Sequence, residues 1–199
     1  MKHGRFLFSL CFVAGLVLVP GQLAAQHDPD QGQGHEPNEE MAAWTALSEP
    51  SEEHGFLEKL VGTWNAKTRF WMAPNAPPIE NEGVSTNEMI LGGRFLRSSF
   101  VGEMFGPFEG IGIDGFDRLK QKYVSTWMDN KGTTIMQFEG EVQGNSRTLR
   151  SELVGPEGQR STMKWVTTIV GQDEHKSEGY EAQAGGEFRK TMEIVFTRQ

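Results

Sequence analysis

The sequence predicts an all-β fold: an antiparallel meander of about ten strands closed into a barrel, with a short N-terminal helix at the barrel floor. Three observations favour it. From Gly62 onward, apolar and polar residues alternate with a period of two, and no stretch after Leu60 has helical periodicity. Clusters of Gly, Pro and Asn divide this region into short segments. The connections are too short for parallel pairing, and a closed barrel or a two-sheet sandwich would protect the edges of so many antiparallel strands.

The negative charge of the chain is concentrated in one segment. The 199 residues include 27 acidic and 19 basic side chains, a formal net charge of −8. Residues 26–53 have no Lys or Arg and carry a charge of −8, whereas residues 54–199 have 17 basic and 19 acidic side chains. A nucleic-acid-binding protein normally shows a basic patch or stripe. Because the positive side chains are scattered, we expect no nucleic-acid partner.

Residues 1–25 have the anatomy of a signal peptide. Lys2 and Arg5 supply a positive start, and the run from Phe6 to Val19 is almost entirely apolar. A Pro-Gly pair breaks this run, and small residues precede Gln26, as at a cleavage site. The run is short for a membrane span, which takes about 20 residues. We expect an exported protein, periplasmic or extracellular, with no membrane association after cleavage; an uncleaved anchor is the alternative.

Residues 26–53 form an acidic linker between this signal and the barrel. Its first part, 26–37, contains no apolar residue, which predicts disorder. Asn38 suits a helix cap, and apolar residues then recur at helical spacing: Met41, Trp44 and Leu47. The second part of the linker is therefore predicted to form a short helix.

Residues 54–199 form the predicted barrel domain. A short helix over 51–60, with Ser51 as its cap, leads into the first strand. The period-two segments predict strands at 62–72, 82–91, 94–105, 107–117, 121–129, 132–142, 146–155, 160–171, 175–183 and 186–198.

The two ends of this domain predict how the barrel closes. Gly62-Thr63-Trp64 places a Gly-x-Trp at the start of the first strand, and Arg198 ends the last strand. In lipocalin-like barrels the tryptophan closes the floor and a cation stacks across it, which buries a large apolar area and adds a cation–π contact. Strand parity then predicts two inward-facing columns: Trp64, Ala66, Thr68, Phe70 and Met72 on the first strand, and Arg198, Phe196, Ile194, Met192 and Lys190 on the last.

Five sequence blocks occur in a characteristic order. They are His54 to Trp64, Gly92-Gly93-Arg94-Phe95-Leu96, Gly112-x-Asp114-Gly115-Phe116-Asp117, Tyr123-Val124-x-x-Trp127-x-Asp129 and Thr197-Arg198. This set resembles bacterial domain-of-unknown-function family 1579, a calycin-like family. The resemblance covers nearly all of residues 54–199. It implies a lipocalin-like β-barrel and no established activity.

Two motifs suggest other chemistry but fit strands and turns better. The segment from Gly110 to Gly115 matches Gly-x-Gly-x-x-Gly, yet a strand follows it, whereas a dinucleotide site needs a helix. We expect these glycines to permit close backbone approach or coiling of a barrel strand. Carboxylates at Asp114, Asp117 and Asp129 suit a hard cation. However, the first two have opposite parity and the last two adjoin turns, so we favour turn formation and expect no metal site.

Histidine and cysteine chemistry is sparse in the predicted mature chain. Cys11, the only cysteine, lies in the signal, which excludes disulfides and thiolate sites after cleavage. His54 precedes the helix and is expected at the barrel floor. His175 is the only candidate for an axial ligand in a haem-binding barrel resembling nitrobindin, but its position beside a turn favours the surface. No nucleophile elbow of the form Gly-x-Ser-x-Gly occurs, so no catalytic residue and no cofactor is predicted.

The barrel interior remains as the candidate site. The residues predicted to bind a ligand there are Phe70, Arg97, Trp127, Phe138, Trp165 and Met192. Arg97, with Arg94 and Glu139, supplies charge for a polar end of such a pocket. The leading hypothesis is an exported barrel that binds a small apolar or amphipathic molecule. The alternatives are a dry, aromatic-filled core, a haem-dependent or other barrel enzyme that uses His175, and a structural or partner-binding barrel whose acidic linker recognises the partner.

Overall fold

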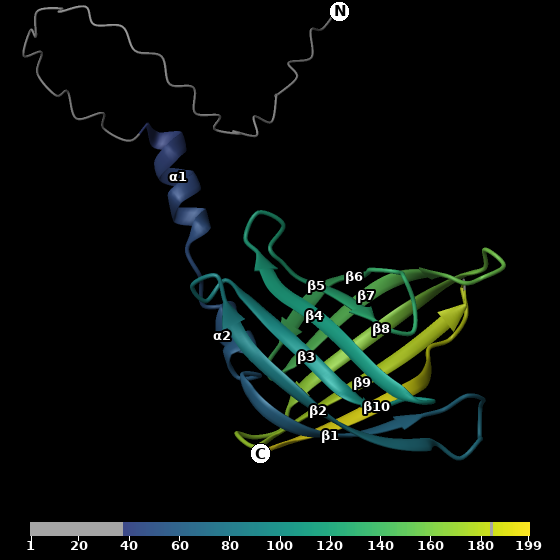
Figure 1. Ribbon diagram of the computed structural model, residues 1–199. Helices are drawn as coiled ribbons and strands as arrows, with labels where there is room; N and C mark the ends of the chain where they lie inside the picture. The colour runs from purple at the N-terminus through teal and green to yellow at the C-terminus, as the bar shows by residue number, and fades with distance from the viewer. Residues whose placement is uncertain (1–37, 184) are drawn as a thin grey trace, which may run out of the picture. The chain divides into compact units, whose positions relative to one another are not determined.

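The computed structural model describes residues 38–183 and 185–199 (Figure 1). The predicted signal at 1–25 and the first part of the acidic linker lie outside these residues. Within the described part of the chain, every helix is too short or too polar to cross a membrane. The described residues form two short helices and ten strands.

The observed elements follow the predicted order closely. The helices are α1 (Glu39–Ser48) and α2 (His54–Glu58). The strands are β1 (Gly62–Phe70), β2 (Ile79–Ile90), β3 (Phe95–Glu103), β4 (Pro107–Asp117), β5 (Lys122–Asp129), β6 (Met136–Gln143), β7 (Ser146–Val154), β8 (Arg160–Ile169), β9 (Glu174–Gln183) and β10 (Arg189–Arg198).

All ten strands pair with their chain neighbours in antiparallel fashion, and β1 pairs with β10 to close the barrel. The closing register places Trp64 opposite Arg198, and Phe70 opposite Met192. The predicted all-β barrel is therefore confirmed. Two parity predictions are wrong. Met72 does not point inward, because β1 ends at Phe70 and Met72 is 68% exposed. A β-bulge between Lys190 and Met192 shifts the register, so that Lys190 lies with Glu193 on the outer face instead of pointing inward.

Helix α2 covers one end of the barrel, the end at which β1 begins and β10 finishes (Figure 1). Phe56, Leu57 and Leu60 are buried in one cluster with side chains from the inner faces of the strands, among them Tyr123 and Leu149. The Tyr123 hydroxyl also donates a hydrogen bond to the Glu53 carbonyl, 2.6 Å away. The apolar face of this short segment thus forms the floor of the barrel. The prediction that Ser51 caps this helix is wrong: Glu53 occupies the N-cap position without a side-chain cap hydrogen bond, and the Ser51 carbonyl accepts the His54 N–H.

The floor closure depends on three residues that meet across the seam. Trp64 is only 1% exposed and donates from Nε1 to the Leu60 carbonyl. The Arg198 guanidinium carbon lies 4.1 Å from the centre of the Trp64 ring, and its Nη1 donates to the Val61 carbonyl. Gly62 has a φ of +135°, and a Cβ there would lie 2.3 Å from Arg198 Nη1. The glycine of the Gly-x-Trp motif therefore makes room for the arginine.

The second part of the acidic linker is attached to the floor end of the barrel by two arginines. Helix α1 begins as predicted, with the Asn38 side chain accepting the Glu40 N–H. None of its residues is buried. Arg94 donates to the Ser48 carbonyl and forms an ion pair with Glu49, while Arg118 donates to the Ala46 and Glu49 carbonyls.

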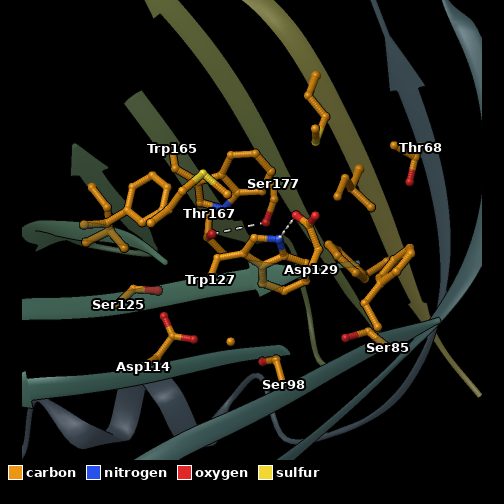
Figure 2. A pocket seen from close by; sticks show the side chains of 18 of the residues that line it. Thr68, Ser85, Ser98, Asp114, Ser125, Trp127, Asp129, Trp165, Thr167 and Ser177 are labelled. Carbon is orange, nitrogen blue, oxygen red and sulfur yellow. Dashed lines mark hydrogen bonds between the residues drawn. The ribbon is translucent and has the colours of Figure 1, made fainter. Parts of the chain in front are cut away.

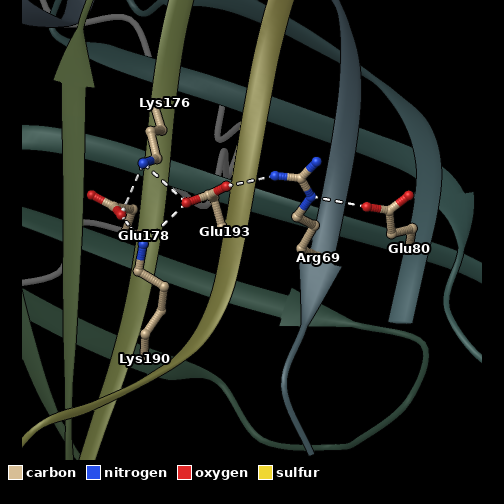
Figure 3. Close-up of polar contacts among 6 residues, drawn as sticks. All are labelled: Arg69, Glu80, Lys176, Glu178, Lys190 and Glu193. Carbon is tan, nitrogen blue, oxygen red and sulfur yellow. Dashed lines mark hydrogen bonds and ion pairs between the residues drawn. The ribbon is translucent and has the colours of Figure 1, made fainter. Parts of the chain in front are cut away.

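A network of ion pairs crosses the closing seam on the outer face, from β9 through β10 and β1 to β2 (Figure 3). Glu193 lies at its centre: its carboxylate oxygens are 2.9 Å from Lys176 Nζ, 3.0 Å from Lys190 Nζ and 3.5 Å from Arg69 Nη1. Burial raises the pKa of Glu193, but hydrogen bonds from the two lysines outweigh it and hold the pKa below the ordinary value. The network joins the first and last strands of the meander.

Replacement of Glu193 by Gln is expected to lower the free energy of unfolding by about 1–2 kcal/mol, since it leaves three cations around an uncharged group. Urea unfolding at low salt measures this, and the loss should shrink at high salt, where repulsion among the cations is screened. Glu80→Gln is the matched control, because Glu80 is a well-exposed end of the network with one partner. Equal effects of the two substitutions would contradict the central role of Glu193.

Candidate functional site

The barrel encloses a cavity of about 340 Å³. All ten strands supply lining residues, mostly from their inward-facing positions. At the floor end the lining includes Leu60, and at the opposite end it includes Glu103, Met104 and Lys131, which lie at or after strand ends. The volume falls at the lower end of the range of about 300–1,000 Å³ that small-molecule pockets occupy.

Aromatic side chains, among them Trp127 and Trp165, form much of the wall (Figure 2). Glycines on neighbouring strands leave room for these two indole rings. Trp127 covers Gly110 on the adjacent strand, where a Cβ would lie 2.2 Å from the indole. Its Nε1 donates to Asp129 Oδ2 at 3.0 Å, and its ring stacks on Phe108. The glycine pattern on β4 therefore serves aromatic packing, consistent with the predicted close approach.

The interior also carries a set of hydroxyl groups spaced around the wall (Figure 2). They belong to Thr68, Ser85, Ser98, Ser125, Thr167 and Ser177. Thr167 and Ser177 hydrogen-bond to each other at 3.1 Å across β8 and β9. A wall that combines indole faces with hydroxyls suits an amphipathic molecule better than a purely apolar one.

A buried ion pair lies in the cavity wall near the floor. Arg147 and Asp114 are 5% and 7% exposed, and Arg147 Nη1 is 2.7 Å from Asp114 Oδ1. The angle of this contact is not that of a hydrogen bond: among the described residues, Arg147 Nε, Arg147 Nη1 and Asp114 Oδ1 all lack hydrogen-bond partners. Phe56 of the floor covers the guanidinium, with 5.7 Å between Cζ and the ring centre. Buried polar atoms without hydrogen bonds lower the stability of the folded protein. These atoms therefore gain more from hydrogen bonds to a polar ligand than any other part of the wall.

His175 is also part of this wall, which corrects the expectation of a surface position. It is 4% exposed, stacks on Phe196 with 4.3 Å between ring centres, and meets Trp64 edge to face at 4.4 Å. Its register position opposite Phe196 explains the burial, since both lie on the inward parity of neighbouring strands. Burial, together with the nearby positive charges of Arg198 and Arg147, lowers the pKa of His175 from 6.5 to about 4.

Comparison with known proteins agrees with this architecture. The family model described as "Protein of unknown function (DUF1579)" matches residues 49–198. The chain belongs to this family. The match begins at Glu49, the linker residue that Arg94 and Arg118 contact.

This DUF1579 chain is similar in fold to a solved structure. The crystal structure of Rv2717c from M. tuberculosis aligns with 76% of this chain and 99% of its own, with a TM-score of 0.55 and 17% identity. At that identity the likeness shows a shared fold alone. No curated protein matches the sequence.

Five of the six predicted ligand-binding residues line the cavity: Phe70, Trp127, Phe138, Trp165 and Met192. Arg97 does not. It shares the outward parity of β3 and forms an ion pair with Glu88 on the outer face, because Leu96 and Phe100 occupy the inward parity.

The other charges considered for a polar end of the pocket are also outside this DUF1579 barrel. Arg94 contacts the linker, and Glu139 pairs with Lys120 on the outer surface. Asp117 does form a turn, accepting the N–H groups of Leu119 and Lys120.

The ion pair that provides the polar end was not predicted from the sequence. Asp114 lies on β4 in the inward parity of Phe108, Gly110 and Gly112, so it belongs to the cavity rather than to a turn. Arg147 shares parity with Leu149 on β7. That shared parity was the available signal in the sequence. Within residues 38–183 and 185–199, no group of three or more His, Cys, Asp or Glu side chains is placed to hold a metal ion.

Proposed function

We propose that this protein binds one small amphipathic molecule inside the barrel and is exported. The observation that carries the first part is the cavity itself: about 340 Å³ of space, walled by aromatic rings and hydroxyls, with buried polar atoms that lack partners. A barrel whose interior served only stability would fill this space with side chains, because interiors pack to nearly crystalline density. A bound ligand would bury the aromatic faces and supply partners for the polar atoms.

The direct test is organic extraction of the native protein, purified under non-denaturing conditions, followed by mass spectrometry. We expect a co-purifying molecule in stoichiometric amount, released on unfolding. An environment-sensitive apolar dye should bind to the extracted protein and be displaced by the extract. Absence of a co-purifying molecule, together with no saturable dye binding, would overturn the proposal.

A pair of neighbouring serines provides a matched mutational test. Ser98 lines the cavity, whereas Ser99 lies on the opposite face of β3 with Arg97 and Val101. Ser98→Phe is expected to weaken dye binding at least tenfold, roughly 1.4 kcal/mol or more, because the ring occupies ligand space. Ser99→Phe should leave the dissociation constant unchanged. Equal effects of the two substitutions would place the dye outside the barrel.

Haem-dependent chemistry at His175 is not favoured by the residues present. Nδ1 of His175 is enclosed, one face of its ring is covered by Phe196, and the field of Arg198 and Arg147 disfavours a cation at the imidazole. The cavity volume is also small for a porphyrin. An absorption band typical of haem in the extracted material would contradict this reasoning.

Export is supported by residues 1–25, with their positive start, apolar run and small residues before Gln26. The expected mature N-terminus is Gln26. Mass spectrometry of the intact protein, isolated from the compartment in which it accumulates, measures this directly. A chain that retains residues 1–25 would contradict the cleaved form.

A further inference from the structure

The buried ion pair of Arg147 and Asp114 limits the chemistry of the ligand. This inference rests on the proposed function, binding inside the barrel, and narrows it to a class of ligand. In the floor half of the cavity, Arg147 and Asp114 are the charged lining residues among those described. The remaining charged lining residues, Glu103, Asp129 and Lys131, lie at the far ends of their strands or just beyond.

The pair presents both kinds of hydrogen-bonding group. Arg147 offers Nε and Nη1 as donors and Asp114 offers Oδ1 as an acceptor. None of the three makes a hydrogen bond within the described residues, although Nη1 and Oδ1 are in ion-pair contact at 2.7 Å. Ser125 lies opposite Asp114 in the β4–β5 register, and Ser98 lies on the neighbouring strand (Figure 2). A polar head group placed here meets donors and acceptors side by side. The head group can hydrogen-bond to both Arg147 and Asp114 only if it carries an acceptor and a donor on adjacent atoms.

The charges of the pair also select against an ionised head group. Arg147 and Asp114 sum to zero, so a carboxylate is attracted by one and repelled by the other, and an ammonium group likewise. Removing an ion from water is costly, and a net-neutral site does not repay that cost. An uncharged head gains the hydrogen bonds without this penalty. Because indole and phenyl rings form much of the rest of the wall, an aromatic body suits it.

We infer that the cavity takes an uncharged aromatic molecule whose head pairs a hydrogen-bond acceptor with a donor, as a carboxamide does, held by Arg147 and Asp114. Four compounds that share one body separate the head-group chemistries: naphthalene carboxamide, naphthalene carboxylate, naphthylmethylammonium and methylnaphthalene. Calorimetry on the extracted full-length protein at about pH 8 keeps the carboxylate ionised and His175 neutral. The carboxamide is expected to bind at least tenfold more tightly than each of the other three.

Asp114→Asn tests the role of the charge at nearly unchanged shape. It leaves Arg147 as an unpaired cation, so the carboxylate should gain at least tenfold in affinity and bind more tightly than the carboxamide. Glu88→Gln is the matched control: it removes the carboxylate partner of an arginine, Arg97, on the outer face, and should leave the wild-type order unchanged.

The outcomes separate this inference from the function on which it rests. If the wild-type protein binds all four compounds equally, or prefers the carboxylate, the inference is overturned while binding inside the barrel stands. If it binds none of them and no dye, the proposed function fails. Should Asp114→Asn not fold, the wild-type order of the four affinities decides alone.

Discussion

Replacement of Trp64 by Ala is expected to lower the free energy of unfolding by about 3–5 kcal/mol, the usual range for truncation of a buried large aromatic residue. The indole is almost wholly enclosed and contacts both ends of the chain: Leu60 accepts its N–H, Arg198 stacks on its face and His175 meets it edge to face. Its loss leaves a void at the closing seam and removes the surface on which Arg198 lies. Urea unfolding followed by far-ultraviolet circular dichroism measures the change.

The matched control is Trp44→Ala, which removes the same side chain from α1, where it is 54% exposed. Its effect should be within about 0.5 kcal/mol, as for an ordinary surface substitution. A loss below about 1 kcal/mol for Trp64→Ala would contradict its role in the floor.

The barrel was predictable because its determinants are local. Period-two alternation and turn residues placed nine of the ten strand starts within three residues of those observed, and the closing register follows from the parity of Trp64 and Arg198. The exception is β6, which begins at Met136 instead of 132. The residues after Gly132 are compatible with either a strand or a loop, and alternation alone does not distinguish them.

The polar end of the cavity was harder to predict because it breaks the rule on which parity rests. Charged residues normally face solvent, so the sequence alone suggests that Arg147 and Arg150 both lie on the surface. Only their opposite parity, with Leu149 between them, shows that one of the pair points inward. Asp114 was hidden in the same way, among glycines that have no inward side chain to reveal the parity of β4. The sequence therefore predicted the aromatic wall and not the buried ion pair within it.

The bulge on β10 shows a second limit. Parity extended through Lys190 predicts an inward ammonium group, but one extra residue in the ladder turns it outward to Glu178 and Glu193. The same bulge allows Lys190 and Glu193, three residues apart, to share one face. Sequence alternation does not reveal it, because Thr191 is compatible with either face of the sheet.

The stability of the protein is expected to fall as the pH is lowered from 6.5 to about 4, because of His175. Its pKa is lowered from 6.5 to about 4 in the folded protein, chiefly by burial. Between these values the unfolded chain binds a proton that the folded barrel does not, so protons favour unfolding. The contribution is fully present above pH 6.5, and about 3 kcal/mol of it is lost by the folded pKa. Urea unfolding across this range measures the loss.

His175→Phe isolates this effect from the titration of carboxylates. A phenyl ring keeps the stacking on Phe196 and removes the titrating nitrogen, and Nδ1 has no partner to lose. The variant should therefore unfold with nearly wild-type stability at neutral pH, and it should be the more stable of the two proteins at about pH 4. The wild-type-minus-variant difference cancels every carboxylate that titrates alike in both proteins. If that difference stays flat from neutral pH to about 4, His175 is protonated in the folded barrel as readily as in the unfolded chain, and its packing between Trp64 and Phe196 does not exclude charge.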